Sequence, residues 1–385
     1  MSESQLLLTP EALRLINQLD PAELQNELSL ITKLRKAGHD KAMVQVAITQ
    51  LKLRERAKNK FGEFANSMLF TSSGLEQATR LDVAAHHAGR FRQNGIKSIT
   101  DMGCGIGADS LAFASLGLDV VAIEKDPETA ALASFNLASF PNVQVKVADA
   151  ETYAPDTEVV WFDPARRQLD SRALNRTLLA PSDFSPNLDY VFEMATKKPL
   201  AVKLGPAFPK ELIPDNAKAQ WVSHRGDLVE LTLWFGFDGK RYAALQLGAK
   251  AHEFQADEIE LAESGLLQDF VYEPDASLIR SALMGNLANQ LGLKTVSPGI
   301  AYLTSEHEID SPWLKKYRVH EVLPLDVKQI SKALAQRGVG RVEIKKRGVD
   351  ITPEELRPKL KLKGSSAATL ILTKVGGARK ALICN

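Results

Sequence analysis

The stretch that decides the fold is ITDMGCGIGAD, residues 99–109. A β-branched run leads into three glycines spaced two apart, and the run SLAFASLG that follows is typical of a helix. Glycines let the backbone turn tightly and approach a ligand closely. A helix that starts at such a turn adds free N–H groups and a partial positive charge. The stretch therefore predicts a strand, a ligand-binding loop and a helix.

Short β-branched runs alternate with helical stretches on both sides of this loop, over residues 76–236. The runs are SITDMG, DVVAIE, VQVKVAD, EVVWFD, LAVKLG, WVSHR and VELTLWF. Strands that alternate with helices predict a parallel sheet covered by helices. Only a few residues separate the last two runs, which leaves no room for a crossover helix. We therefore expect these two runs to form an antiparallel hairpin at the sheet edge.

The glycine pattern alone does not decide the ligand. Gly103, Gly105 and Ala108 also satisfy a dinucleotide fingerprint, with Glu124 about 20 residues further on as its ribose acid. Asp101, however, stands two residues before the first glycine. A carboxylate there suits a ligand with a free amino group better than a pyrophosphate.

Acids stand at the ends of the first four predicted strands: Asp101, Glu124, Asp149 and Asp163. Glu124 is placed to accept ribose hydroxyls, and Asp149 to accept an adenine amino group. Any one of these acids could serve as a turn residue or a helix N-cap. Four of them beside a glycine loop favour a single crevice at the carboxyl ends of the strands, where open α/β sheets bind ligands.

The segments DMGCGIGADS, AIEKDP, VADAETY and WFDPARR resemble the successive motifs of class I S-adenosylmethionine (SAM) dependent methyltransferases. The terminal hairpin is also typical of that family. The resemblance implies a Rossmann-like α/β fold with a seven-stranded sheet over residues 76–236, and SAM as cofactor. The residues that it implies for SAM fall into three groups: Asp101, Gly103, Gly105 and Gly107 around the methionine part, Glu124 (with Asp126 as a weaker candidate) at the ribose, and Asp149 and Ala150 beside the adenine.

The remaining chain divides into a helical region over residues 1–75, a mixed connecting region over 237–310 and a small α+β domain over 311–385. In the first region, Thr9-Pro10 and Asp20-Pro21 each predict the start of a helix. Further helices are predicted over SLIRSALMGNLANQLGL, DVKQISKALAQRG and TPEELRPKL, and the last domain adds a strand at RVEIKKRG and the run ATLILTKVG. SGLEQATRLDVAAHHAGRF and RGVDITPEELRPKLKLKGSSAATLILTK resemble a bacterial subgroup of RNA methyltransferases with a THUMP-like C-terminal domain. That resemblance implies tRNA or rRNA as the substrate.

Charge supports a nucleic-acid partner for the last 75 residues. They hold 17 Lys and Arg against 6 Asp and Glu, a net charge of +11, although the whole chain carries only +1. Such asymmetry indicates a nucleic-acid-binding part, with a solvated lysine-rich surface as the alternative. The best basic patch consists of Lys345, Lys346 and Arg347 together with Lys359, Lys361 and Lys363. The last three alternate, so on a strand they would share one face.

The acceptor side of the site is predicted at Asp163-Pro164-Ala165-Arg166-Arg167. Methyltransferases that act on exocyclic base nitrogens commonly carry Asp/Asn-Pro-Pro followed by an aromatic residue. This chain keeps Asp163 and Pro164 and has Arg166 in place of the aromatic. Arginine can stack on a base or bind a phosphate, so we expect Asp163, Pro164 and Arg166 to be catalytic and Arg167 to bind substrate.

Other candidates carry weaker signals. Lys203 ends the fifth predicted strand, where it could bind a phosphate or cap the sheet edge. His86 and His87 fit ordinary positions of an amphipathic helix. Cys104 and Cys384 form no metal-binding or disulfide spacing, which predicts a reducing cytoplasm and no metal. The N-terminus does not resemble a signal peptide, and no apolar run approaches the roughly 20 residues that span a bilayer.

Two further functions compete with RNA methylation at this stage. The chain could methylate a small molecule or a protein, with the basic domain serving folding or oligomer contacts. It could also be an accessory protein that binds SAM or RNA without catalysis, an alternative motivated by Ala165-Arg166.

Overall fold

The computed structural model describes residues 2–166 and 180–385. The chain forms two compact units, which are described separately. The first unit comprises residues 1–204, 208–217 and 232–238, and the second comprises 205–207, 218–231 and 239–385. The unit boundary falls within strand β9 (Asp227–Phe235), which contributes residues to both units.

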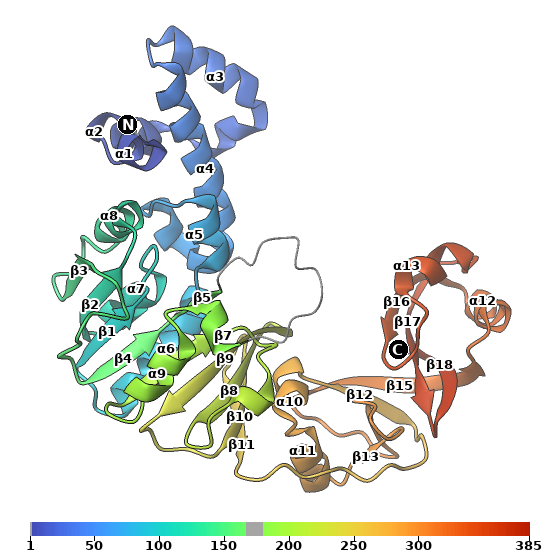
Figure 1. The fold of residues 1–385 in the computed structure, drawn as a ribbon. Helices are drawn as coiled ribbons and strands as arrows, with labels where there is room; N and C mark the ends of the chain where they lie inside the picture. Colours follow the sequence, from blue (N-terminus) through green and yellow to red (C-terminus); the bar gives the residue numbers. More distant parts are fainter. Residues whose placement is uncertain (1, 167–179) are drawn as a thin grey trace. The chain divides into compact units, whose positions relative to one another are not determined.

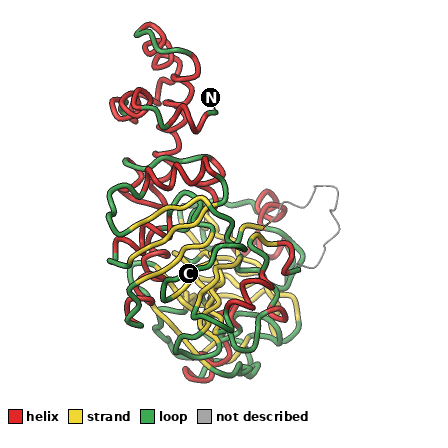
Figure 2. Tube along the Cα trace, turned by 60° about the vertical axis from the view of Figure 1, so that its left-hand side comes forward, coloured by secondary structure: helices red, strands yellow, loops and turns green. Residues whose placement is uncertain are grey.

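The first unit begins with helices, shown in red in Figure 2. They are α1 (Glu3–Leu7), α2 (Pro10–Gln18), η1 (Pro21–Asn26), α3 (Glu27–Lys36), α4 (Lys41–Phe61), η2 (Gly62–Asn66), α5 (Ser72–Gln77) and α6 (Leu81–Gln93). The Thr9 side chain accepts a hydrogen bond from Ala12 N and so caps α2, as Thr9-Pro10 predicted. The second predicted helix starts as the 3₁₀ turn η1 and becomes α-helical only at Glu27.

The sheet of the first unit follows the predicted runs (Figure 1). Its elements are β1 (Ser98–Met102), α7 (Ala108–Ser115), β2 (Asp119–Glu124), α8 (Pro127–Asn136), β3 (Val143–Val147), β4 (Val159–Phe162), α9 (Leu188–Met194) and β7 (Leu200–Leu204). The strand order is β9-β7-β4-β1-β2-β3. Pairings β1–β2, β1–β4, β2–β3 and β4–β7 are parallel, as the strand–helix alternation predicted.

Alternation along these strands decides which side chains share a face. Ile99, Val159 and Trp161 belong to one buried cluster with α6 and α7. Phe162 points to the other face and packs against Tyr190 of α9, with ring centroids 6.4 Å apart. Helices therefore cover both faces of the sheet. Along a strand, a residue two positions after one that faces α6 and α7 also faces α6 and α7.

In the second unit, β8 (Lys218–His224) leads into β9 through a two-residue turn at Arg225 and Gly226, both with positive φ (52° and 92°). A turn of this kind joins antiparallel strands, so the predicted hairpin is confirmed. Its predicted place at the sheet edge is wrong. β10 (Tyr242–Leu247) pairs in parallel with β8, and β11 (His252–Ala256) follows antiparallel to β10.

A second, seven-stranded sheet has the order β13-β14-β12-β15-β18-β17-β16. Its strands are β12 (Phe270–Pro274), β13 (Lys294–Thr295), β14 (Leu303–Ser305), β15 (Leu314–Pro324), β16 (Val339–Lys346), β17 (Ser366–Val375) and β18 (Ala378–Cys384). The long strand β15 pairs with β12 in its first half and with β18 from Val319 onward, and a bulge between Val319 and Glu321 interrupts the pairing with β18. The last strand, β18, was not among the sequence predictions.

Two helix predictions in this unit are corrected. SLIRSALMGNLANQLGL breaks into α10 (Ala276–Ser281) and α11 (Met284–Leu291), because Ala282 ends α10 with a left-handed φ of 70°. Gly285 lets α11 lie close to the main chain at Glu260, where an added Cβ would come within 1.9 Å of the carbonyl oxygen. The predicted helix over TPEELRPKL is only α13 (Pro353–Leu356) followed by the 3₁₀ turn η5 (Arg357–Lys359), whereas α12 (Val327–Gln336) is confirmed.

Candidate active site

The carboxyl ends of the first unit's strands bring four charged residues to one face of the sheet. Asp101 lies two positions after Ile99 on β1, and Glu124 closes β2. Asp163 follows β4 two positions after Trp161, and Lys203 is on β7. The period of two places all four on the α6–α7 face. Three of the predicted acids therefore share one face at the strand ends, together with a lysine.

The glycine loop has the backbone conformation that the sequence predicted. Gly103, Gly105 and Gly107 all have positive φ, at 88°, 55° and 89°. An added Cβ on Gly107 would meet Leu137 at 2.9 Å, whereas one on Gly105 would meet no atom within 4 Å. The loop thus needs glycine at 107 for close packing, and at 105 it leaves its backbone open to a ligand.

Asp101 is 1% exposed, and its Oδ2 accepts a 2.6 Å hydrogen bond from the Ser110 hydroxyl. Its other oxygen is buried and has no hydrogen-bond partner among the described residues. Burial, and then the nearby Asp109 carboxylate, raise the pKa of Asp101 well above its usual range. An orphaned buried acceptor of this kind fits a ligand that brings its own donor, such as an ammonium group.

Glu124 is bound to the loop through both carboxylate oxygens. Oε2 accepts from Gly105 N at 3.0 Å, and Oε1 accepts from Asp126 N at 2.9 Å. Each oxygen can accept a further hydrogen bond. The carboxylate is therefore oriented before any ligand arrives, with acceptor capacity for hydroxyl groups.

The weaker candidate Asp126 is the N-cap of α8, because its Oδ2 accepts from Thr129 N at 2.9 Å and from Thr129 Oγ1 at 2.6 Å. These hydrogen bonds, the side-chain one first, lower the pKa of Asp126. Asp149 accepts from Lys125 Nζ at 2.7 Å and from Glu151 N at 3.0 Å, which together lower the pKa of its carboxyl. Ala150, predicted beside the adenine, is buried.

Asp163 and Lys203 form an ion pair, with Lys203 Nζ 2.5 Å from Asp163 Oδ2. The same ammonium donates to Thr79 Oγ1 at 2.5 Å and lies 3.8 Å from Asp109 Oδ2. Thr79 in turn donates to Asp109 Oδ2 at 2.7 Å. The side chain of Lys203 is only 12% exposed, so it is a buried partner of two acids and not a lysine that reaches into solvent.

His87 completes this group. It is fully buried on α6, its Nδ1 lies 3.5 Å from Asp109 Oδ1, and its ring centroid is 4.5 Å from that of Trp161. Burial raises the pKa of Asp109, but Lys203 and then His87 outweigh burial, so the pKa lies below its usual value.

Thr79, His87 and Asp109 were not predicted as site residues. Val83, His87 and Phe91 stand four apart on one helix face, and Asp109 lies in the first turn after the glycine loop. The helical spacing of His87 and the position of Asp109 directly after the glycine loop are the sequence signals that could have identified these two residues.

The acceptor motif is described only in part. Pro164 is buried, and Ala165–Arg166 forms the short strand β5, which pairs with β6 (Phe184–Ser185). The side chain of Arg166 and the whole of Arg167 lie outside the described residues.

The predicted basic patch separates into two environments. Lys345 Nζ lies 2.5 Å from Glu273 Oε2, and Arg347 lies 3.8 Å from the same carboxylate. Lys346, by contrast, is exposed, as are Lys359, Lys361 and Lys363. Lys359, Lys361 and Lys363 do not lie on a strand: Lys359 ends η5, and residues 361–363 form a loop.

The alternation itself nevertheless holds. Leu360 is buried and Leu362 is partly buried, and both pack into the core beneath α12. Lys361 N donates to Ser331 Oγ on α12 at 3.1 Å. The leucines therefore anchor this loop, and the lysines between them face solvent.

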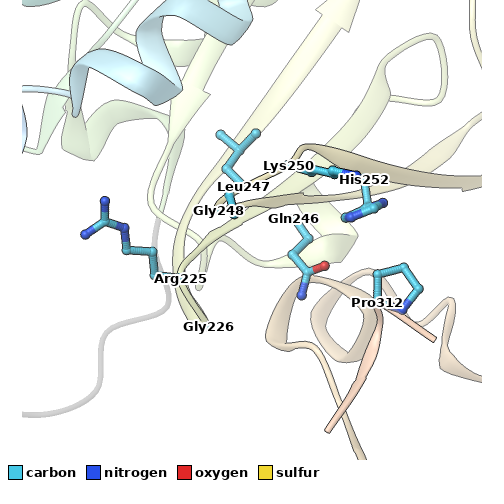
Figure 3. A pocket seen from close by; sticks show the side chains of 9 residues that line it. Arg225, Gly226, Gln246, Leu247, Gly248, Lys250, His252 and Pro312 are labelled. Atoms are coloured by element: carbon cyan, nitrogen blue, oxygen red, sulfur yellow. The ribbon is translucent and has the colours of Figure 1, made fainter. Parts of the chain in front are cut away.

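A pocket of about 410 Å³ lies in the second unit (Figure 3). It is lined by Arg225, Gly226, Gln246, Leu247, Gly248, Ala249, Lys250, His252 and Pro312. The Arg225 side chain points away from Gln246, His252 and Pro312 in Figure 3. None of the predicted site residues lines this pocket.

Proteins of similar sequence show which family the chain belongs to. Two strains of Mycobacterium tuberculosis hold an uncharacterized S-adenosylmethionine-dependent methyltransferase that is 30% identical over 339 residues, covering 84% of this chain and 91% of the relative. The chain is a SAM-dependent methyltransferase. Its cofactor is therefore SAM, and the orphaned oxygen of Asp101 beside an open glycine loop is consistent with that cofactor.

Other comparisons cover the fold and the ends of this methyltransferase. The crystal structure of a candidate methyltransferase from Porphyromonas gingivalis W83 has a TM-score of 0.74 and 20% identity, and covers 100% of this chain and 98% of that one. A family model described as THUMP domain-like matches residues 314–385. A second, described as a domain of unknown function (DUF8688), matches residues 2–57. No helix in the described part of the chain is long and apolar enough to cross a membrane.

Proposed function

We propose that this methyltransferase methylates a nucleotide in tRNA or rRNA. The observation that carries the RNA substrate is the row of exposed lysines at 359, 361 and 363 within the THUMP domain-like segment. Buried Leu360 and partly buried Leu362 anchor the loop between these lysines, and no acid interrupts the sequence between them. Such a row fits a phosphate backbone, which basic side chains bind with the release of counterions.

For the cofactor, we assign Asp101, Glu124, Asp149 and Ala150 together with the glycine loop. The free oxygen of Asp101 would accept from the amino group of the methionine part. Glu124, held by Gly105 N and Asp126 N, would accept from the ribose hydroxyls. Asp149 and Ala150 would border the adenine. When bound, SAM supplies an electrophilic methyl group on a sulfonium.

For the acceptor, we assign Asp163 and Pro164. The Asp163 side chain is 31% exposed, so it is accessible to an acceptor while it is bound by Lys203. Its carboxylate would orient the acceptor by accepting a hydrogen bond and would take the proton that the acceptor loses. Arg166 and Arg167 follow directly and are assigned to substrate contacts on sequence grounds.

The test uses tritiated SAM, purified protein and total RNA from a strain that lacks the gene. RNase-sensitive label is the expected result, and nucleoside analysis of the labelled RNA then identifies the methylated atom. SAM binding with no label in RNA would reject the RNA substrate and favour a small-molecule or protein acceptor. The Asp163→Ala variant is the matched control, because it should bind SAM and transfer no methyl group.

A further inference from the structure

The carboxylate assigned to the acceptor side is held by a network of side chains whose contacts with one another the sequence did not predict. Lys203 Nζ contacts Asp163 Oδ2 at 2.5 Å. The ammonium has three N–H donors. Thr79 Oγ1 accepts a second of them at 2.5 Å, and Asp109 Oδ2 lies 3.8 Å away. Lys203 is therefore held from three directions, and its position fixes that of Asp163.

The far side of this chain is fixed to the core. Asp109 accepts from Thr79 at 2.7 Å and faces His87 Nδ1 at 3.5 Å. The His87 ring packs against Trp161 of β4, two positions before Asp163, which follows the end of that strand. The network thus begins just after β4 at Asp163, passes through β7, α7 and α6, and returns to β4 at Trp161.

A purely structural ion pair is a poor explanation for this arrangement. Apolar residues of similar volume stabilise a core as well as a buried ion pair does. Here two acids and a lysine lie at the carboxyl edge of the sheet, where ligands of α/β folds bind. Perturbed ionisable groups cluster at functional sites.

We propose that Lys203 is a positioning residue, oriented by Thr79 and Asp109, that holds the Asp163 carboxylate ionised and directed at the methyl acceptor. This inference rests on the proposed function, because it assumes the role given there to Asp163. Lys203 keeps its proton throughout. The proton lost by the acceptor goes to Asp163 and then to water.

The charges around the pair determine the pH behaviour. Asp101 and Asp109 face it from β1 and α7, His87 faces Asp109 from α6, and Lys60 of α4 interacts with Lys203. Burial first, and then Arg80 and Lys203, lower the pKa of Lys60 to about 8. Without Lys203, the Asp163 carboxylate would lose the ammonium 2.5 Å away, which favours its ionised form. The pKa of Asp163 should then rise, and the protonated form cannot accept the acceptor's proton.

The experiment compares wild type, Lys203→Met and Thr79→Val in single-turnover methyl transfer to RNA from pH 5 to 9 at saturating SAM. We expect Lys203→Met to lower the rate at pH 7 by about tenfold or more and to move the acidic limb of the profile to higher pH. Thr79→Val should shift the limb in the same direction by less. A uniform loss of rate at every pH, or an unchanged profile in both variants, would overturn the inference.

The control is Lys198→Met, which removes a part-buried lysine that donates to the carbonyls of Pro155 and Thr157. It should leave the acidic limb in place. Affinity for SAM, measured by calorimetry, should change by less than about twofold in Lys203→Met, because the lost contact is on the acceptor side.

A second readout needs no RNA. Carbon-13 NMR of protein labelled at the aspartate carboxyls, with Asp163→Asn to assign the signal, measures the pKa of Asp163 in wild type and in Thr79→Val and Lys203→Met. An unchanged pKa overturns the role of Lys203, whatever the RNA result. A raised pKa together with unlabelled RNA would reject the RNA substrate and leave the hold of Lys203 on Asp163 standing.

Discussion

Lys203 and Lys361 carry the same charge in opposite surroundings. Lys203 is 12% exposed and contacts two acids and a threonine. Lys361 is exposed, and its backbone N–H is bound by Ser331. The first lysine acts on neighbours inside the protein, and the second presents its charge to the solvent. If these surroundings separate the two roles, substitutions at the two sites should impair different steps.

The largest expected effect is on catalysis by Asp163. Asp163→Ala should lower methyl transfer by at least about 100-fold, because it removes the proton acceptor and the group that orients the substrate. SAM affinity should stay within about twofold, since the loss is on the acceptor side. Tritium transfer and calorimetry on the same preparation measure both. Full transfer by Asp163→Ala would remove this residue from the catalytic machinery.

The next effect concerns the cofactor side. Asp101→Asn keeps the shape of the side chain and removes its charge. A hydrogen bond to a charged group contributes about 1.5–3 kcal/mol, so SAM affinity should fall by roughly 10- to 100-fold. Asp126→Asn is the matched control, because Asp126 caps α8 and asparagine is an equally good N-cap. Equal losses in the two variants would contradict the assignment of Asp101.

The assignments of Asp163 and Asp101 show which parts of the site the sequence can predict. Motif residues at strand ends were predictable, because parallel strands bring their carboxyl ends to one edge and the period of two decides the face. The side chains that pair with these residues were not predictable. Nothing in the sequence pairs Lys203 with Asp163, or Lys345 with Glu273, since the residues of each pair are joined only by the fold.

The fold shows the same division. The seven predicted strands of the first sheet are all present, because each is a local β-branched run. The extension by β10 and β11 and the break of one helix at Ala282 were missed. The extension depends on contacts between distant segments, and the break depends on a left-handed alanine that no turn residue marks.

The third prediction concerns the exposed lysines. Combined Lys359→Ala, Lys361→Ala and Lys363→Ala should weaken RNA binding and reduce the slope of log affinity against log salt by about one per lysine that contacts a phosphate. Filter binding at several salt concentrations measures the slope. Lys345→Ala is the comparison, because that lysine already pairs with Glu273 and should change the slope little. Equal slopes for wild type and the triple variant would show that RNA binds to another surface of the protein.

The smallest effect is on stability as a function of pH. Because burial first, and then Asp109, raise the pKa of Asp101 above its unfolded value, the folded state holds a proton that the unfolded state releases. Stability from this group is therefore present below the unfolded pKa of about 4 and is lost as pH rises toward the folded pKa.

Asp101→Asn removes this dependence. The melting temperature of the wild type should fall relative to that of the variant as pH rises from 5 to 8, by on the order of a few degrees. Scanning calorimetry without ligand measures the difference. Saturating SAM should reduce it if the amino group of SAM binds the free oxygen of Asp101, because a bound cation favours the ionised carboxylate in the folded state. If SAM leaves this difference in melting temperature unchanged, the ionisation of Asp101 is not linked to cofactor binding.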